Sequence, residues 1–135
     1  MTLRIDSTIE DAGKSADADE IVGNADGGKI EFYTGTPPAS LGDSPGGTLL
    51  VTIDLPTPAF GAASAGVATL NGTPHTEAAV DDGTIGWARV LDSTDAVIWD
   101  ESDVGTGGGN AIQVSDTSIV ENQDLTIDSY TFTVS

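Results

Sequence analysis

The sequence predicts an all-β protein, a single antiparallel β-sandwich or jelly roll of about seven strands with a short N-terminal helix. Two observations favour this fold class. Short runs of alternating apolar and polar residues recur along the chain, and turns rich in glycine, proline and aspartate separate them. No helix-length periodic segment lies between these runs, and 135 residues suit one domain with a modest core.

The stretch Thr84–Asp100 is the clearest structural signal and predicts a β-hairpin. Its two apolar runs, Ile85–Leu91 and Ala96–Trp99, flank Asp92-Ser93-Thr94-Asp95, a four-residue turn of side chains that bond to nearby backbone. Both tryptophans of the chain lie here, so the hairpin carries much of the available apolar area. The pattern alone does not decide which face of the first strand is buried.

The other alternating runs complete the strand set. The predicted strands are residues 29–34, 48–55, 66–71, 84–91, 96–101, 111–118 and 124–134. Residues 36–47 are expected to form a loop because two consecutive prolines cannot sit in a central strand, and residues 71–83 are expected to form a polar loop. In the last strand the apolar parity changes after Ile127, which predicts a β-bulge near Asp128-Ser129.

Residues 1–28 differ in character from the β-sandwich domain expected over residues 29–135. This acidic segment predicts a marginal helix over residues 8–22, with a thin apolar stripe of Ile9, Ala12 and Ala16 that continues through Glu20 or through Asp19 and Val22. Gly13 weakens such a helix by about 1 kcal/mol relative to alanine. The helix therefore needs a packing partner, either its own sandwich or another subunit, so a docking or oligomer contact is expected here.

The charge balance excludes several kinds of partner. There are 22 acidic residues against four basic ones, a formal net charge of −18. Such a surface repels nucleic acids and anionic membranes. Because molar salt screens this self-repulsion, the composition favours a salt-adapted protein from a halophile over an acidic mesophilic protein. The chain has no cysteine, no apolar signal-peptide core and no run of membrane-spanning length, so we expect synthesis in the cytoplasm without an export signal.

Few residues suggest catalysis or metal binding, and we expect no catalytic, cofactor-binding or metal-binding residues. His75 lies in a predicted loop and has no evident triad partner. Calcium or magnesium at the acidic loops stays open as an alternative, since hard cations prefer oxygen ligands. The acidic groups in question are Asp17-Ala18-Asp19-Glu20, Asn24-Ala25-Asp26-Gly27, Asp81-Asp82 and Asp100-Glu101-Ser102-Asp103.

Two further features are singled out by their residue types. Gly105–Asn110 is a glycine-rich tip that lacks the lysine and following helix of a phosphate loop. Arg89 is the only basic residue after Lys29. We expect it to pair with a cross-strand carboxylate such as Asp100 or to stack on a tryptophan, and a role across a subunit interface is the alternative.

The motifs GKIEFYTGTPPAS, GTLLVTIDLPTPAFGAASAGVAT, GTIGWARVLDSTDAVIWD, VGTGGGN and TSIVENQDLTIDSYTFT together resemble a group of small tailed-phage virion proteins. The similarity runs from about residue 28 to the end. The resemblance implies a β-sandwich structural protein of a tailed virus, with no catalytic residues to carry over. Relatives often have a more apolar N-terminal helix, and this chain departs from them there. With the acidic composition, a virus of a halophilic archaeon is implied.

The leading hypothesis is a virion structural protein, a capsid decoration or turret that forms a homo-oligomer on the shell and contacts the major capsid protein or other virion proteins. A neck, tail or fibre component is the runner-up. A second hypothesis is a glycan- or receptor-binding module that uses the loops Thr73–Gly83 and Gly105–Asn110. A small hydrolase would need His75 close to a serine or a carboxylate. The leading hypothesis places the protein in the virion, released from the host cytoplasm with the particles.

Overall fold

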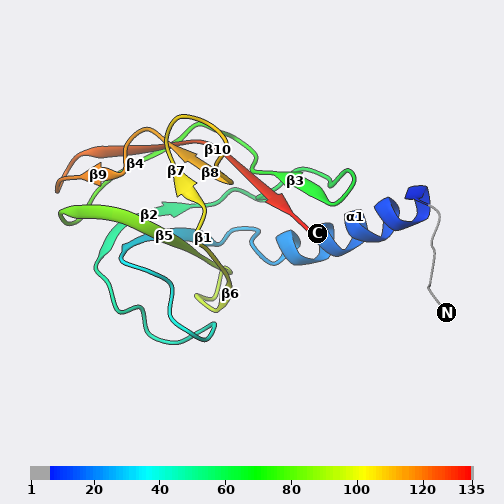
Figure 1. Ribbon diagram of the computed structural model, residues 1–135, viewed down its shortest axis with the longest axis horizontal. Coiled ribbons are helices and arrows are strands. Elements are labelled where there is room, and N and C mark those ends of the chain that lie inside the picture. Colours follow the sequence, from blue (N-terminus) through cyan, green and yellow to red (C-terminus); the bar gives the residue numbers. More distant parts are fainter. Residues whose placement is uncertain (1–6, 135) are drawn as a thin grey trace.

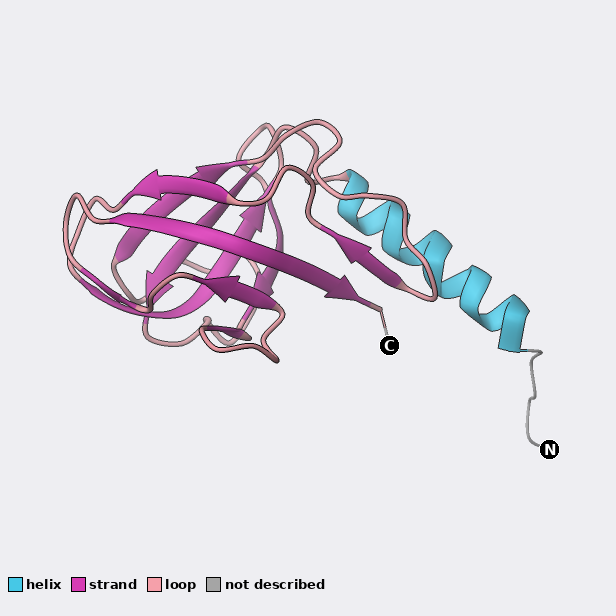
Figure 2. Ribbon diagram, turned by 90° about the horizontal axis from the view of Figure 1, so that it is seen from above, coloured by secondary structure: helices cyan, strands magenta, loops and turns pink. Residues whose placement is uncertain are grey.

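The computed structural model describes residues 7–134 and shows a mostly β protein in which two sheets pack as a sandwich (Figures 1 and 2). One short helix stands at the N-terminal end of the described chain, as the sequence predicts. The elements are α1 (Ser7–Gly23), β1 (Lys29–Thr34), β2 (Leu49–Asp54), β3 (Val67–Thr69), β4 (His75–Ala78), β5 (Gly83–Leu91), β6 (Val97–Glu101), β7 (Val104–Gly105), β8 (Ile112–Val114), β9 (Ser118–Ile119) and β10 (Asp124–Thr133). In this part of the chain no helix is long and apolar enough to cross a membrane.

Each sheet is organised around one long strand. In the first sheet the order is β2-β1-β5-β6, and β9 also pairs with β5. In the second sheet the order is β3-β10-β8-β7, and β4 also pairs with β10. The short pair β7–β8 is parallel, whereas the other pairs between the described strands are antiparallel. The predicted antiparallel sandwich is therefore confirmed, with one parallel pair at the margin of the second sheet.

The number of strands was underestimated, because three short strands pair where the sequence shows little alternation. The predicted polar loop 71–83 contains β4, which pairs with the first half of β10. The predicted strand 111–118 is divided into β8 and β9, and these pair with different sheets. The third is β7, which is two residues long. The formation of strands this short depends on the strands that pair with them rather than on their own side chains.

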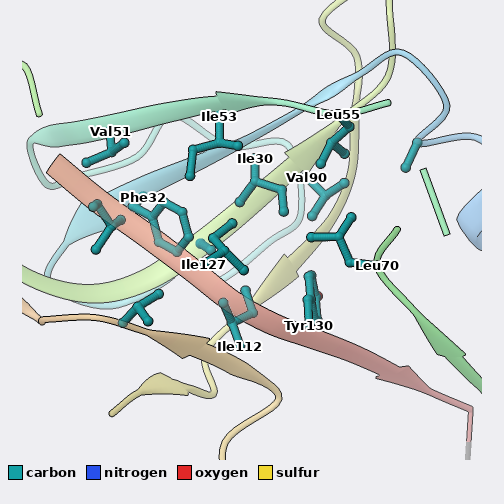
Figure 3. Close-up of a cluster of buried hydrophobic side chains, with 14 of the residues drawn as sticks. Ile30, Phe32, Val51, Ile53, Leu55, Leu70, Val90, Ile112, Ile127 and Tyr130 are labelled. Carbon is teal, nitrogen blue, oxygen red and sulfur yellow. The ribbon is translucent and has the colours of Figure 1, made fainter. Parts of the chain in front are cut away.

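The core lies between the two sheets (Figure 3). The first sheet contributes Ile30, Phe32 and Val90, and each of these side chains is fully buried. From the second sheet, Ile127 and Tyr130 face them. Burying such a side chain stabilises the fold by about 1.5–3 kcal/mol.

The predicted bulge in β10 is confirmed. The pairing of β10 with β8 shifts register between Ile127 and Ser129. Residues 127 and 130 have opposite parity in a regular strand, yet both Ile127 and Tyr130 are buried in the core cluster. The extra residue in the bulge turns the second half of the strand so that both can face inward.

Strand β5 is buried on both faces. Ala88 and Val90 belong to the core cluster, whereas Trp87 and Arg89 point to the opposite side of the sheet. The pairing with β1 skips Gly86, since Tyr33 pairs with Trp87 and Thr34 with Ile85. A side chain at Gly86 would collide with the backbone of Gly35, so glycine is required at this bulge.

The helix α1 packs against β3 and the end of β10. Its first half extends past the sandwich (Figure 2). Among the side chains described for this helix, those of Ala18 and Val22 are buried, and Ala25 just after the helix is also buried. Ser15 Oγ accepts a hydrogen bond from Gly66 N at 3.2 Å, which ties the helix to the turn before β3.

The predicted apolar stripe on this helix is confirmed at Val22, which is buried, and is wrong at the other described positions. Ala12, Ala16 and Glu20 are exposed, and Asp19 is exposed as well. The side chain of Ile9 lies outside the described side chains. The buried residues are Ala18, Val22 and Ala25, which lie at helical spacing, and the sequence pattern placed the apolar face at Ala12 and Ala16 instead.

Candidate functional site on the outer face of the first sheet

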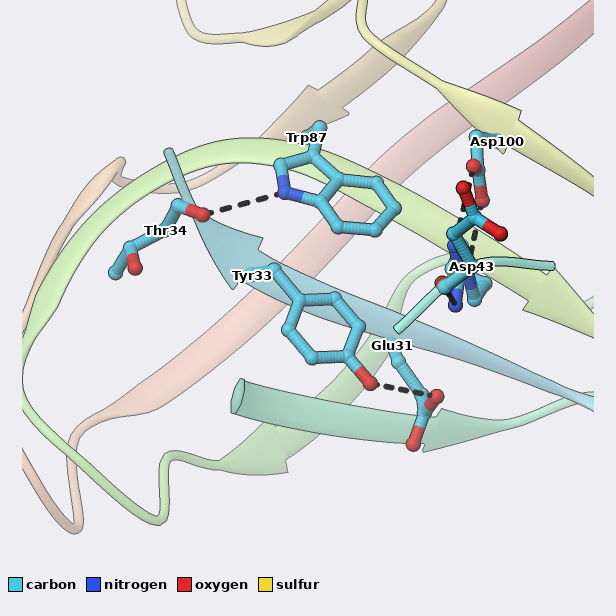
Figure 4. Close-up of polar contacts among 7 residues, drawn as sticks. Glu31, Tyr33, Thr34, Asp43, Trp87 and Asp100 are labelled. Atoms are coloured by element: carbon cyan, nitrogen blue, oxygen red, sulfur yellow. Dashed lines mark hydrogen bonds and ion pairs between the residues drawn. The ribbon is translucent and has the colours of Figure 1, made fainter. Parts of the chain in front are cut away.

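The outer face of β1, β5 and β6 carries a second cluster of buried side chains, apart from the sandwich core (Figure 4). It consists of Tyr33, Trp87, Arg89 and Asp100, and we call it the outer cluster. Trp87 is 0 % exposed and Tyr33 is 8 % exposed, although both lie on the side of the sheet that faces away from the core. The loop 35–47 is tied to this cluster through a bond to Asp43.

The two aromatic rings of the outer cluster stack. The Tyr33 and Trp87 ring centroids lie 4.9 Å apart with an interplanar angle of 18°. Trp87 Nε1 donates a hydrogen bond to Thr34 O at 3.2 Å, and the Tyr33 hydroxyl donates to Glu31 Oε1 at 3.0 Å. Burial, and after it the hydrogen bond to Glu31, raises the pKa of Tyr33 to about 12.

Arg89 is held from three sides. Its Nε donates to Asp100 Oδ1 at 2.8 Å and its Nη2 donates to Asp100 Oδ2 at 3.3 Å, a bidentate ion pair. Its Nη1 donates to Asp43 O at 3.0 Å, and its guanidinium carbon lies 5.1 Å from the Trp87 ring centroid. The hydrogen bond to Asp100 raises the pKa of Arg89.

Both expected partners of Arg89 are thus confirmed, since it pairs with Asp100 and stacks on a tryptophan. The residue is 4 % exposed, so its charge is used within the chain. In the part of the chain that the structure describes, no buried side-chain nitrogen or oxygen lacks a hydrogen-bond partner. The outer cluster is therefore tied to loop 35–47 by the bond from Arg89 Nη1 to Asp43 O, while its other polar groups bond within the sheet.

A second polar network connects the two sheets near β6. Trp99 Nε1 donates to the Tyr130 hydroxyl at 2.7 Å, and this hydroxyl donates to Glu101 Oε1 at 3.1 Å. Burial, and after it the charge of Glu101, raises the pKa of Tyr130 well above its usual value. The chain of bonds joins β6 in the first sheet to β10 in the second.

The structure places His75 in strand β4, so the predicted loop position is wrong. Its Nε2 donates to Asn71 O at 2.7 Å. A catalytic triad requires the imidazole to bond a nucleophile and a carboxylate. The bond seen here goes to a backbone carbonyl instead, and it fixes the turn before β4.

The predicted acidic groups serve mainly as caps of backbone amides. In four cases a carboxylate accepts a hydrogen bond from a residue distant in sequence. These pairs are Asp19 with Ala63 N (2.8 Å), Asp26 with Ala59 N (2.8 Å), Asp82 with Glu121 N (2.6 Å) and Asp103 with Ala111 N (3.0 Å). Asp81 accepts from Asp82 N, while Asp17 and Glu20 are exposed on α1. Among the residues described, no three potential metal ligands lie close enough together to hold an ion.

The turn between β5 and β6 is also capped by a carboxylate. Asp92 Oδ1 accepts hydrogen bonds from Thr94 N at 2.8 Å, from Thr94 Oγ1 at 2.7 Å and from Ala96 N at 3.0 Å. The bond from the Thr94 hydroxyl contributes most to lowering the pKa of Asp92 from its usual value of 3.8. The predicted four-residue turn is confirmed, and Asp92 N bonds Ala96 O across it at 2.9 Å.

A small pocket of about 190 Å³ lies between the end of α1 and residues 58–62. Asp19, Asp26 and Phe60 are among the residues that line it. Both carboxylates already accept the backbone amides named above, so the pocket offers few unused polar groups.

Of the two segments considered for ligand binding, Thr73–Gly83 connects the second sheet to the first, and Gly105–Asn110 connects β7 to β8 in the second sheet. The first contains β4 and ends at Gly83, the first residue of β5. In the second, Gly108 N donates to Gln113 Oε1 at 3.2 Å and Asn110 Nδ2 donates to Thr106 O at 3.3 Å. These bonds hold the glycine-rich tip to its own ends.

No family model, no curated protein and no solved structure matches this chain.

Sequence reasoning foresaw the Arg89 pair and missed the covered aromatic stack beside it. The signal was present in β5, where apolar residues occur at both parities: Ile85, Trp87 and Leu91 on one, Ala88 and Val90 on the other. A strand that is apolar on both faces is buried on both faces.

Proposed function

We propose that the protein is a non-enzymatic structural protein of a tailed virus particle, a capsid decoration or turret that assembles as a homo-oligomer. The observation that carries the proposal is the use of its polar groups. The polar groups of the outer cluster, those of the network at Tyr130 and the aspartates that cap loop amides find their hydrogen-bond partners within the chain. Such a molecule is suited to hold a fixed shape.

The surface charge supports the same proposal. A net charge of −18 repels nucleic acids and anionic membranes. Proteins are the partners that remain, in salt concentrated enough to screen this charge. The resemblance of residues 28–135 to small tailed-phage virion proteins points to a particle as the place of assembly. The major capsid protein is the partner we propose, and a halophilic archaeon is the proposed host.

Mass spectrometry of particles purified from the virus that encodes this chain tests the proposal. We expect the chain in gradient-purified virions at a copy number in the range of shell components. Its absence from infectious particles would end the idea. Cryo-electron microscopy of the same particles then separates a position on the shell from one in the neck, tail or fibre.

A binding assay separates a shell component from a receptor-binding module. Recombinant chain should sediment with capsids in molar KCl and should not bind arrayed host-surface glycans. Saturable glycan binding that is lost when Gly107, Gly108 and Gly109 are replaced by bulkier residues would favour the receptor-binding module instead.

A further inference from the structure

Two connecting segments meet at one end of the sandwich, beside β9 and the start of β5 (Figure 1). Residues 79–82 connect β4 to β5, and residues 120–123 connect β9 to β10. The two segments are bonded to each other, since Ala79 N donates to Gln123 O at 2.8 Å and Asn122 N donates to Ala79 O at 2.8 Å. We call them together the distal end, because α1 lies at the other end of the molecule.

Each segment of the distal end exposes one valine. Among the described residues three large apolar side chains are exposed, and two of them are Val80 and Val120, each 60 % exposed. Backbone bonds hold both positions: Val80 N donates to Leu50 O at 2.8 Å, and Gln123 N donates to Val120 O at 3.0 Å. A surface that is already held in place loses little conformational freedom when a partner binds to it.

Exposed carboxylates stand next to these valines. Asp81 and Asp82 follow Val80, Glu121 follows Val120, and all three acidic residues are exposed. Asp82 Oδ1 also accepts a hydrogen bond from Glu121 N at 2.6 Å, which joins the two segments a second time. The distal end therefore combines two exposed valines with a rim of negative charge.

The lysine and arginine side chains of the described residues are placed elsewhere. Lys29 is paired with Asp95, and Arg89 is paired with Asp100. Lys14 lies on α1, at the opposite end of the molecule (Figure 1). Within residues 7–134, no lysine or arginine therefore offsets the charge of the distal end.

We propose that the distal end is a docking surface for a protein segment that presents an apolar side chain flanked by lysine or arginine. An apolar centre with a polar rim is the usual anatomy of a protein interface. The acidic rim selects a basic partner by charge complementarity, and it disfavours a second copy of this chain, whose distal end carries the same carboxylates. The inference rests on the proposed structural function, in which the chain attaches to another protein, and it names the surface and the chemistry of that contact.

Binding of designed peptides, mapped by nuclear magnetic resonance on the isotope-labelled full chain, is the first test. Two peptides of equal length are titrated in KCl from dilute to molar: lysine and leucine alternate in one, glutamate and leucine in the other. We expect the lysine peptide to shift the amide signals of residues 79–82 and 120–123, and the glutamate peptide to shift none. In molar KCl the Debye length is about 3 Å, so diffuse attraction to other acidic surfaces is screened.

Variants separate the apolar and the charged contributions. Val80→Ser keeps the net charge and should raise the dissociation constant of the lysine peptide about tenfold. Leu41→Ser is the matched control, because Leu41 is 58 % exposed outside the distal end. All these variants change exposed side chains, and far-ultraviolet circular dichroism checks their folding.

The double change Asp81→Asn with Glu121→Gln should flatten the salt dependence of binding, since rim charges act chiefly through that dependence. Asp17→Asn with Glu20→Gln removes the same charge from exposed positions on α1 and should leave the salt dependence nearly unchanged.

The outcomes separate this inference from the proposed function. Signal changes spread over all acidic surfaces, no binding of the lysine peptide, or equal weakening by Val80→Ser and Leu41→Ser each overturn the docking surface, while the chain can still be found in particles. A dimer seen by light scattering that Val80→Ser dissociates would also overturn it, since the occupant would then be a second copy. Localised binding that Val80→Ser weakens supports the inference even if mass spectrometry finds no such chain in virions.

Discussion

Replacing Arg89 by glutamine tests how much the outer cluster contributes to stability. The change removes both bonds to Asp100, the bond to Asp43 O and the stacking on Trp87. The side chain of Asp100 is 12 % exposed, so its charge would lose its partner in a poorly hydrated position. Lys29→Gln is the matched control, because it also removes one positive charge but breaks an exposed ion pair with Asp95.

The expected size of the effect follows from burial. Removing one partner of a buried ion pair costs about 3–5 kcal/mol, and we take about 3 kcal/mol because the side chain of Asp100 remains 12 % exposed. The entropy of unfolding is about 2.1 cal/mol/K per residue, or roughly 0.28 kcal/mol/K for 135 residues. Arg89→Gln should therefore lower Tm by about 10 °C. Lys29→Gln should lower it far less, since exposed ion pairs contribute little.

Differential scanning calorimetry of both variants in molar KCl provides the measurement. The common change in net charge cancels in the comparison, and the high salt screens what remains. Limited proteolysis should in addition show faster cleavage within residues 35–47 of Arg89→Gln, because its anchor at Asp43 is lost. Equal Tm values for the two variants would refute the argument that this buried pair holds the loop.

Three further changes have expected outcomes. Tm should rise steeply from dilute buffer to molar KCl, as the Debye length falls from about 30 Å at 0.01 M to about 3 Å at 1 M, and a flat curve would show that self-repulsion is unimportant. The lowered pKa of Asp92 means that its contribution is present above pH 3.8 and is lost as pH falls through the folded-state pKa. Thermal scans from neutral to acidic pH should therefore show Asp92→Asn less stable near neutrality and equal to wild type in acid; a gap that persists in acid would contradict this. Tyr130→Phe removes the hydroxyl between Trp99 and Glu101 and should lower the unfolding free energy in urea by about 1–3 kcal/mol. An unchanged urea midpoint would mean that water replaces the hydroxyl.

The sequence by itself determined the features that depend on local patterns. Alternation at period two located most of the long strands, and the turn residues from Asp92 to Asp95 defined the central hairpin. The parity change after Ile127 located the bulge in β10, because a bulge shifts the apolar set by one residue. The pairing of Arg89 with Asp100 also followed from sequence, since the predicted hairpin places Asp100 on the strand next to Arg89.

Tertiary structure decided the features that depend on contacts between distant segments. The short strands β4, β7 and β9 exist because longer strands pair with them, and their own residues carry little signal. The helix α1 buries Ala18 and Val22 and leaves Ala12 and Ala16 exposed, because its packing against β3 and β10 decides which face of the helix turns inward. The position of loop 35–47 beside the outer cluster likewise depends on a long-range contact, the bond from Arg89 Nη1 to Asp43 O, which no hydrophobic pattern reveals.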